Sequence, residues 1–259
     1  MDEKGSMKIS IVTVVYNNPQ VHEALDSILN QKFEGDLESI VVDGGSRAET
    51  LDALKPYLPR LGHFVSERDK GIYDAMNKGI ALATGDIVGT LNSDDLYADD
   101  QVLQKVLEAF RDPSIDIVYG DLEYVSASDT SRVIRYWRSK PYRPGLFEKG
   151  WMPPHPTFFV RRQVFERCGS FNLDYRIAAD FELMLRFMAR HNTPSVHLPE
   201  VLVKFRMGGA SNQSLRNILK ANLESHRACM ENGLKIAPWF IIQKIGSRIP
   251  QFFRRKGSS

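Results

Sequence analysis

The sequence is poor in cysteine and contains no long apolar run. Its 259 residues include two cysteines, Cys168 and Cys229, which are far apart and outside any metal-ligand spacing. Both are therefore expected to be free thiols, as in a cytoplasmic protein. No stretch approaches the roughly 20 apolar residues of a membrane-spanning helix. The N-terminus lacks the charged-then-apolar pattern of a secretory signal, which also favours a cytoplasmic location.

The sequence also lacks an excess of charge of either sign. Its 34 Lys and Arg residues nearly balance 32 Asp and Glu residues, for a formal net charge of +2. A nucleic-acid partner is not expected, because too little positive charge is present to neutralise a phosphate backbone. The positive charge is local, since no acidic residue follows Glu231. The basic residues beyond that point are Lys235, Lys244, Arg248, Arg254, Arg255 and Lys256.

Apolar runs alternate with amphipathic segments in the first half of the chain. The predicted strands cover residues 8–16, 37–45, 63–67, 86–91 and 115–121, and the predicted helices cover 21–29, 49–58, 73–83 and 99–110. This alternation is typical of an α/β fold with a Rossmann-like, mostly parallel central sheet flanked by helices. Ligands of such sheets bind at the carboxyl ends of the strands.

The pattern changes after Asp121. Short alternating strands are predicted over 122–138, and a segment rich in Pro, Gly and aromatic residues, 141–156, is expected to fold over the rim of the sheet. A strand at 156–162, a helical turn at 162–168 and helices at 180–190 and 215–230 follow. We predict one catalytic domain over 7–212, with a small mixed β region, and a C-terminal helical extension over 213–259.

Polar residues follow the predicted strands where a glycine-rich phosphate loop would be expected. Neither GxGxxG nor GxxxxGK[ST] follows the first strand, so backbone amides alone would not cradle a diphosphate. Asn17, Asp43 and Asp94 instead end three of the predicted strands. In "NSDD", residues 92–95, paired carboxylates would repel a diphosphate unless Mg²⁺ or Mn²⁺ lay between them. The alternative is an Asx-type turn that caps the next helix.

Several motifs, taken in order, resemble the family 2 glycosyltransferases of bacterial surface-polysaccharide assembly, including O-antigen, capsule and exopolysaccharide. These motifs are "VDGGS", "DKGIYDAMNKG", "ATGDIVGTLNSDD" and "HPTFF…AADFELMLR". The similarity covers roughly residues 7 to 210. It implies a GT-A fold, a nucleotide-diphospho-sugar donor, a divalent cation and inversion at the anomeric carbon by direct displacement.

The resemblance also implies roles for individual residues. Those implied to bind the nucleotide sugar are Tyr16, Asp43, Asp69, Lys70, Gly71, Asn77, Asn92, Ser93 and Asp95. Asn92 departs from the family, because many members carry a carboxylate at this first position of the Asp-x-Asp motif. Asp94 is therefore expected to be the principal metal ligand, and Asp95 is expected to assist it or to orient the donor sugar.

Direct displacement at a sugar carbon needs a base for the acceptor hydroxyl. Asp180 matches the family's catalytic Asp, with Glu182 as the second choice, and the alternative role for Asp180 is a carboxylate stabilising a helix N-terminus. Positive groups are also expected near the leaving diphosphate. The candidates are Lys70, His155, Arg161 and Arg206. His155 is a candidate second metal ligand or a hydrogen-bond donor to the diphosphate.

The C-terminal tail has an amphipathic pattern in which Trp239, Ile242, Ile245, Ile249 and Phe252 oppose Gln243, Lys244, Ser247, Arg248 and Gln251. Aromatic residues beside cations suit the surface of an anionic bilayer. We therefore expect peripheral association with the inner membrane. Packing on the catalytic domain, or on a second copy in a homodimer, is the alternative.

Together these observations predict an inverting, metal-dependent hexosyltransferase. It would move a sugar, first of all from a UDP-sugar, to a hydroxyl of a lipid-linked oligosaccharide. A sugar nucleotidyltransferase is a second possibility, but "YNNPQ" lacks the Gly-rich, basic signature expected after its first strand. A non-catalytic sugar-nucleotide-binding protein is the third.

Overall fold

The computed structural model describes residues 6–207, 215–241 and 244. Nine strands form one mixed sheet in the order β3-β2-β1-β4-β8-β6-β9-β5, with β7 paired to β6. The strands are β1 (Lys8–Val15), β2 (Asp36–Asp43), β3 (His63–Ser66), β4 (Ile87–Thr90), β5 (Leu96–Tyr97), β6 (Ile117–Ser126), β7 (Val133–Trp137), β8 (Phe159–Arg161) and β9 (Ser195–Met207). The helices are α1 (Val21–Leu29), α2 (Ala48–Leu54), α3 (Ile72–Leu82), α4 (Val102–Ala109), α5 (Arg162–Cys168), α6 (Ala179–Leu185) and α7 (Leu215–Glu231).

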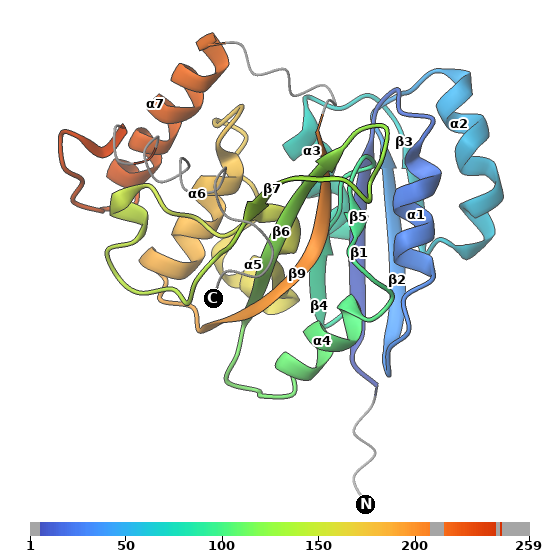
Figure 1. Cartoon of the computed structure of the whole chain (residues 1–259), viewed down its shortest axis with the longest axis horizontal. Helices are drawn as coiled ribbons and strands as arrows, with labels where there is room; N and C mark the ends of the chain where they lie inside the picture. The colour runs from blue at the N-terminus through green and yellow to red at the C-terminus, as the bar shows by residue number, and fades with distance from the viewer. Residues whose placement is uncertain (1–5, 208–214, 242–243, 245–259) are drawn as a thin grey trace, which may run out of the picture.

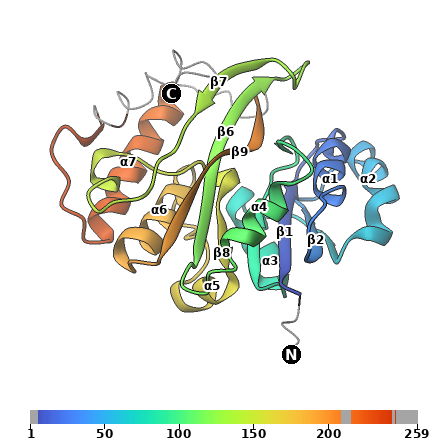
Figure 2. The same ribbon diagram turned by 60° about the horizontal axis from the view of Figure 1, so that its bottom comes forward.

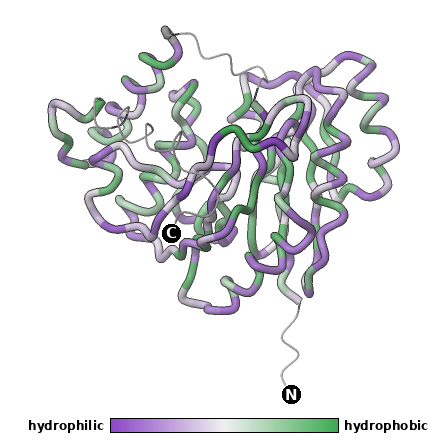
Figure 3. Tube along the Cα trace, in the orientation of Figure 1, coloured by the Kyte–Doolittle hydropathy of each residue, from purple (hydrophilic) through white to green (hydrophobic). Residues whose placement is uncertain are grey.

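Strand β1 lies in the middle of the parallel half of the sheet, with β2 on one side and β4 on the other. It is buried from Ile9 to Val15 because helices cover both of its faces. Ile9 and Ile11 join the cluster that contains the buried side chains of α1 and α4, while Val12 and Val14 join the cluster formed with α3. Figures 1 and 2 show these helices on either side of the sheet. In Figure 3 the hydrophobic colouring follows the central strands.

The parallel register brings the carboxyl ends of four strands to one rim. Val15 of β1 pairs with Asp43 of β2, and Asp43 pairs with Ser66 of β3. The chain after β4 continues along β1, because the Ser93 amide donates to the Val14 carbonyl at 3.3 Å. The predicted convergence of the strand-end polar residues is confirmed.

Two strands were absent from the sequence prediction. Strand β9 pairs with β6 in parallel, from Ile117↔Ser195 to Ser126↔Met207, and the short β5 pairs with β9 in the antiparallel direction. Pro199 and Glu200 interrupt the apolar pattern of β9, and a shift in register accompanies this interruption. Pairing with β6 overrides that weak local signal. As a result, β9 carries Arg206 to the rim beside the loop that follows β4.

A second core lies between the β6–β8 half of the sheet and helices α5, α6 and α7. Phe181 and Met184 contribute the inner face of α6, and Ala228 and Cys229 contribute that of α7. Both cysteines are free, as predicted. Over the predicted helix 180–190, the structure has α6 followed by one π-helical turn, Arg186–Arg190.

The described part of the C-terminal tail packs on this second core. Phe240 is fully buried, whereas Trp239 keeps 56% of its surface exposed. Lys244, which was expected on a cationic outer face, is instead buried against the Phe181 ring and donates to the Ser225 hydroxyl. The rest of the predicted amphipathic segment, apart from Ile241, lies outside the described residues. Within the described ranges, no helix is long and apolar enough to cross a membrane.

Candidate active site

The loop after β4 holds residues 92–95 against the end of β1. The Asn18 side-chain amide donates to the Ser93 carbonyl at 3.0 Å and to the Ser93 hydroxyl at 3.2 Å. The Asn92 side-chain amide donates to Asp95 Oδ2 at 3.2 Å, which closes a tight turn within the motif. Asp95 is fully buried, and Asp94 is half-buried. The turn therefore places one carboxylate in the wall of the rim and the other closer to its surface.

Burial dominates the electrostatics of this pair. It raises the pKa of Asp94, while the charges of Arg206 and His155 act in the opposite direction. Burial also raises the pKa of Asp95 well above its usual range, and the charge of Asp94 adds to that rise. Hydrogen bonding to Asn92 and the nearby Arg206 counteract it only in part. For both carboxylates, burial thus outweighs the nearby positive charge.

The donor atoms of this turn fit a divalent cation. Asp95 Oδ1 and Asn92 Oδ1 are buried and accept no hydrogen bond from any described residue. Oxygen atoms of this kind are the preferred ligands of Mg²⁺ and Mn²⁺. Among the described residues no group of three or more His, Cys, Asp or Glu side chains could enclose a metal ion by itself. The turn therefore fits a cation that takes much of its coordination shell from a bound phosphate group and water.

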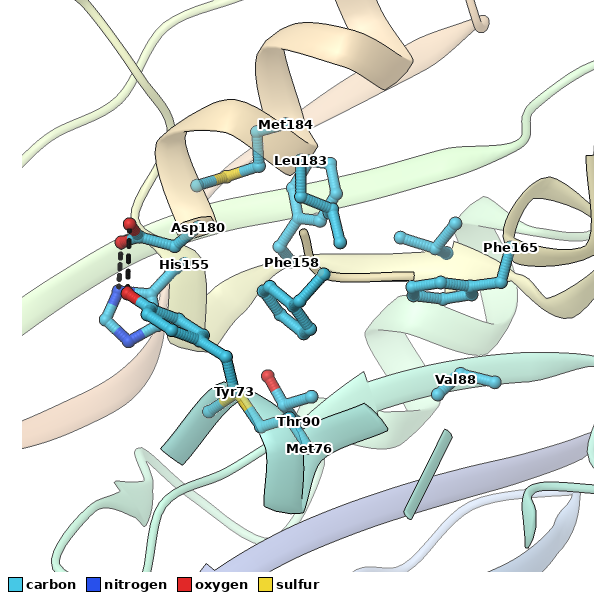
Figure 4. Close-up of a pocket in the computed structure, with 12 residues that line it drawn as sticks. Tyr73, Met76, Val88, Thr90, His155, Phe158, Phe165, Asp180, Leu183 and Met184 are labelled. Atoms are coloured by element: carbon cyan, nitrogen blue, oxygen red, sulfur yellow. Dashed lines mark hydrogen bonds and ion pairs between the residues drawn. The ribbon is translucent and has the colours of Figure 1, made fainter. Parts of the chain in front are cut away.

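Asp180 lies near the start of α6, where three elements meet (Figure 4). Its Oδ2 is 3.5 Å from His155 Nδ1, and its Oδ1 is 3.4 Å from the Tyr73 hydroxyl. Oδ1 also accepts the backbone N–H of Phe181 at 2.8 Å. His155 comes from the short helix before β8, and Tyr73 comes from α3. Asp180 is thus held at the rim while 18% of its side chain stays exposed.

His155 lies near both predicted acidic groups. Burial lowers its pKa, and the charges of both Asp180 and Asp94 act against that shift. Because both carboxylates affect the imidazole, the predicted base and the predicted metal ligand share one site. The structure brings His155, Asp94 and Asp180 together at the rim.

A small apolar cavity lies beneath Asp180. It measures about 30 Å³ and lies between Tyr73, Asp180 and apolar side chains of α3, α6 and β8. The other lining residues are Met76, Val88, Thr90, His155, Phe158, Val160, Phe165, Phe171, Leu183 and Met184. Apolar surroundings on this side leave the rim as the polar approach to the Asp180 carboxylate.

Tyr16, Asp43 and Asp69 lie together at the ends of the first three strands. A Cβ at Gly44 would overlap Asp69 Oδ2 and would come within 3.4 Å of the Tyr16 ring. Tyr16 is 66% exposed, whereas Asp43 is fully buried. The Asp43 carboxylate accepts the Ser66 hydroxyl at 2.7 Å and the backbone amides of residues 45 and 46. In this structure Asp43 therefore fixes the turn that follows β2.

The loop before α3 contains Asp69, Lys70 and Gly71. Asp69 Oδ1 accepts the Gly71 amide at 2.8 Å, and Gly71 has φ +127°, in the region that favours glycine. Lys70 is exposed at this rim. Asn77, further along α3, donates to the Phe171 carbonyl and accepts the Phe171 amide, both at 2.9 Å. These two bonds hold the loop at Phe171, and a contact of Asn77 with the nucleotide stays a prediction.

Two candidates lie away from the rim. Arg161 binds the carbonyls of Ile115 and Phe110, each at 2.7 Å, and it pairs with Ile87 at the start of β4. It is therefore at the opposite edge of the sheet, and the prediction that it faces a diphosphate is wrong. Glu182 is 4% exposed and binds Arg186 at 2.9 Å. Because α6 turns its side chain inward, Glu182 is unsuited to the role of second-choice base.

Arg206 and Tyr73 complete the site. Arg206, a predicted cation, pairs with Glu23 of α1 and affects both Asp94 and Asp95. Tyr73 was part of a recognised motif but was not singled out. The sequence contains one signal for this role. Tyr73 is the second residue of α3, which starts at the rim, and an aromatic side chain there faces whatever covers the rim. The contact with Asp180 spans 107 residues along the chain and could not be read from local spacing.

Solved structures share this fold at low sequence identity. The mannosyltransferase PcManGT from Pyrobaculum calidifontis, solved with GDP-Man and Mn²⁺, superposes with a TM-score of 0.65 at 22% identity and covers 96% of this chain and 71% of its own. TarS residues 1–349 from S. aureus, in complex with UDP-GlcNAc, gives a TM-score of 0.65 at 16% identity, over 94% of this chain and 73% of its own. The fold is GT-A, as the sequence predicted.

Sequence comparison gives the family. A PGL/p-HBAD biosynthesis glycosyltransferase of Mycobacterium bovis is 34% identical over 194 residues, which are 73% of this chain and 72% of the relative. A glycosyltransferase of Mycobacterium tuberculosis is 30% identical over 183 residues, or 69% and 68%. The family model described as "Glycosyl transferase family 2" matches residues 10–169. With the strand-end carboxylates, the GT-A fold and these relatives in agreement, this chain belongs to glycosyl transferase family 2.

Proposed function

We propose that this glycosyltransferase is an inverting, metal-dependent hexosyltransferase that uses a nucleotide-diphospho-sugar and transfers its sugar to a hydroxyl of a lipid-linked acceptor. The observation that carries the proposal is the joint placement of Asp94, His155 and Asp180 at one rim. Relatives and neighbours support the substrate classes. One relative is described as acting in PGL/p-HBAD biosynthesis, and solved neighbours hold UDP-GlcNAc or GDP-Man, the latter with Mn²⁺.

In this proposal Asp180 is the general base. As the acceptor oxygen bonds to the anomeric carbon, its proton passes to an Asp180 carboxylate oxygen, and the bond from that carbon to the diphosphate oxygen breaks. The attack and the departure lie on opposite faces of the sugar, so the configuration inverts. Tyr73 and His155 hold the carboxylate toward the rim. The apolar cavity behind it leaves the acceptor only the polar side from which to approach.

Asp94 and Asp95 form the proposed cation site, with Asn92 as a neutral oxygen donor beside them. A divalent cation bound there would neutralise the charge that gathers on the departing diphosphate. Arg206 lies close enough to both carboxylates to contribute positive charge on the same side. Lys70 stands exposed on the loop before α3 and is a proposed contact of the diphosphate. The exposed ring of Tyr16 is proposed to flank the base, next to Asp69.

The acceptor and the membrane remain proposals of the same kind. Trp239 and the α7 residues Leu219, Leu223 and Met230 each keep more than half of their surface exposed. Lys220 and Arg227 lie on the same helix. Such a surface suits the interface of an anionic bilayer, on which a lipid-linked acceptor would reside. A second copy of the chain remains the alternative occupant of this surface.

The test of the proposal is Asp180→Asn. The amide keeps the shape of the side chain and can still accept the Phe181 N–H, but it cannot take a proton. We expect binding of UDP or GDP with Mn²⁺, measured by calorimetry, to stay within about twofold of the wild type. Nucleoside diphosphate release from UDP-glucose, UDP-GlcNAc or GDP-mannose should fall by about 10² to 10⁴.

The matched control is Asp174→Asn, an exposed carboxylate on the loop before α6. It should release nucleoside diphosphate at the wild-type rate. Wild-type turnover by Asp180→Asn would remove Asp180 from the role of base. Complete loss of nucleotide binding by the same variant would instead indicate a binding role.

A further inference from the structure

A single peptide group before helix α6 is held from two sides. The Tyr73 hydroxyl of α3 donates to the Ile177 carbonyl at 2.8 Å. Glu224 of α7 accepts the amide N–H of Ala178 at 2.9 Å through Oε2. The Ile177 carbonyl and the Ala178 amide belong to the same peptide unit. Elements that lie far apart in the chain thus fix both polar ends of one peptide plane.

Glu224 makes further contacts with the same segment. Its Oε2 also accepts the Ile177 amide at 2.8 Å, and its Oε1 accepts the Arg176 amide at 3.3 Å. The residue is 8% exposed, so these bonds satisfy a carboxylate that would be costly to bury without partners. Three consecutive backbone amides converge on one side chain from a different helix. This contact constrains both the position and the twist of the segment.

Tyr73 is equally well fixed. Its ring packs against Phe171 with a centroid distance of 5.2 Å, and Asn77 holds the Phe171 backbone. Burial raises the pKa of the phenol well above its usual range, and the charge of Asp180 adds to that rise. The hydroxyl is therefore protonated and remains a donor over the physiological range.

The peptide held in this way sets the start of α6. Ala178 is the N-cap residue of α6, and its own side chain makes no capping hydrogen bond. Asp180 lies two residues further on, and its Oδ1 is 3.4 Å from the same Tyr73 hydroxyl. A rotation of the Ile177–Ala178 peptide would therefore move the Asp180 carboxylate. A shift of about 1 Å in a reacting group can reduce a rate by about 10².

We propose that Tyr73 and Glu224 are positioning residues for Asp180, so that helix α7 is a working part of the active site. The proposal rests on the proposed role of Asp180 as general base. It assigns to Glu224 neither substrate nor metal. Its effect is to hold the backbone from which the base projects.

Two variants test the proposal in the full chain. Glu224→Gln keeps the size of the side chain but presents an amide N–H₂ to one backbone donor, and Tyr73→Phe keeps the ring but removes the hydroxyl. We expect kcat for nucleoside diphosphate release from the best of UDP-glucose, UDP-GlcNAc and GDP-mannose to fall by about 10- to 100-fold. KM for that donor should change by less than about threefold.

Matched controls separate positioning from general damage. Glu231→Gln removes another α7 carboxylate, one that accepts the Tyr175 hydroxyl and does not contact the 176–178 backbone. Tyr57→Phe removes a hydroxyl that binds Asp26 at 2.9 Å. Both should keep kcat within about twofold of the wild type. Equal losses in the controls and the test variants would overturn the proposal.

A double-mutant cycle distinguishes this inference from the proposed function. On the Asp180→Asn background, Glu224→Gln should cause almost no further loss, because residues that act as one unit are not additive. An additive loss would mean that Glu224 acts elsewhere. If Asp180→Asn alone kept wild-type turnover, the proposed base would fail instead. If Asp180→Asn were inactive while Tyr73→Phe and Glu224→Gln kept wild-type kcat, only the present inference would fail.

Hydrogen exchange provides a second readout that does not depend on the donor. In Glu224→Gln the amides of Arg176, Ile177 and Ala178 should exchange at least about tenfold faster, while α7 itself keeps its protection. Unchanged exchange at these three amides would overturn the proposal even without an active substrate.

Discussion

The two ends of the parallel strands treat a buried carboxylate in opposite ways. Near the start of β2, Glu38 is 5% exposed, and both of its carboxylate oxygens accept hydrogen bonds. After the end of β4, Asp95 is fully buried, and one of its oxygens has no partner among the described residues. At the first edge, the protein itself supplies the hydrogen bonds of the buried carboxylate. At the other edge, a buried acceptor is left that suits a ligand.

The pKa values follow the same division. Burial tends to raise the pKa of Glu38, but hydrogen bonds from Lys8, Ser10 and Thr84 together lower it to about 2. The bonds measure 2.7 Å from Lys8 Nζ, 2.5 Å from Ser10 Oγ, and 2.8 and 2.7 Å from the Thr84 amide and hydroxyl. Around Asp95 burial prevails, and the pKa rises. Burial is similar at both edges, but hydrogen bonds outweigh it at Glu38 and stabilise the charge, whereas at Asp95 they do not.

The largest expected effect comes from Asp94→Asn, which alters the edge after β4. The variant keeps the shape of the turn but removes the carboxylate closest to its surface. Affinity for UDP or GDP in the presence of Mn²⁺ should fall by about 100-fold or more, because a cation site loses its main anionic ligand. Calorimetry with and without EDTA measures it. Metal-dependent affinity equal to that of the wild type would refute Asp94 as the ligand.

The second-largest expected effect is on stability, and it comes from a substitution of Glu38 at the other edge. Glu38→Gln should lower the free energy of unfolding by about 2–3 kcal/mol near pH 6, because it removes the charge that three side chains and a backbone amide stabilise. Urea unfolding measures this value. Glu34→Gln, which removes an exposed partner of Arg111, is the control and should cost at most about 1 kcal/mol.

The pH dependence of this difference has a definite sign. The pKa of Glu38 is about 2 in the folded chain, below the 4.5 of the model compound, so the carboxylate contributes stability above pH 4.5. That contribution is lost as the pH falls toward 2. The gap between wild type and Glu38→Gln should therefore shrink to about 1 kcal/mol near pH 3. A gap that widened on acidification would contradict the assignment.

The smallest expected effect distinguishes the two edges by the sign of the change in free energy of unfolding. Asp95→Asn keeps the volume of the side chain but removes a charge that burial disfavours. We expect the metal-free protein to gain about 1 kcal/mol in free energy of unfolding, since a charged carboxylate is costly to bury without full compensation. Thermal unfolding in EDTA measures the change. A loss comparable to that of Glu38→Gln would show that the two edges are energetically alike.

Sequence reasoning located the elements that depend on local pattern. The apolar runs of β1, β2 and β4 and the helical spacing of α1, α3 and α4 were close to the observed bounds, because burial on both faces leaves a strong periodic signal. The convergence of Asp43 and Asp94 followed from the same pattern, since parallel strands end at one rim. Asp180 depended on the family resemblance, and its role as base is still a prediction.

The remaining errors have a common origin in long-range contacts. Strand β9 is interrupted by polar residues and owes its form to β6, which precedes it by some 70 residues. Lys244 looked like a surface cation, but Phe181 and Ser225 bury it. Arg161 was grouped with phosphate-binding cations, although its strand runs antiparallel to β4 and ends at the opposite edge. Each outcome depends on partners that a local window of sequence does not contain.

The hydrogen bonds from α3 and α7 to the Ile177–Ala178 peptide have a consequence for chimeras that exchange segments between relatives. The match to the family model ends at residue 169, so Asp180 and Glu224 both lie beyond the matched segment. A chimera that joined this chain's first 169 residues to another enzyme's remainder would keep Tyr73 but receive a foreign partner for it. We expect such a hybrid to be active only when its C-terminal part supplies a helix with a carboxylate that matches Glu224. Tyr73 and this helix would therefore be inherited as one unit.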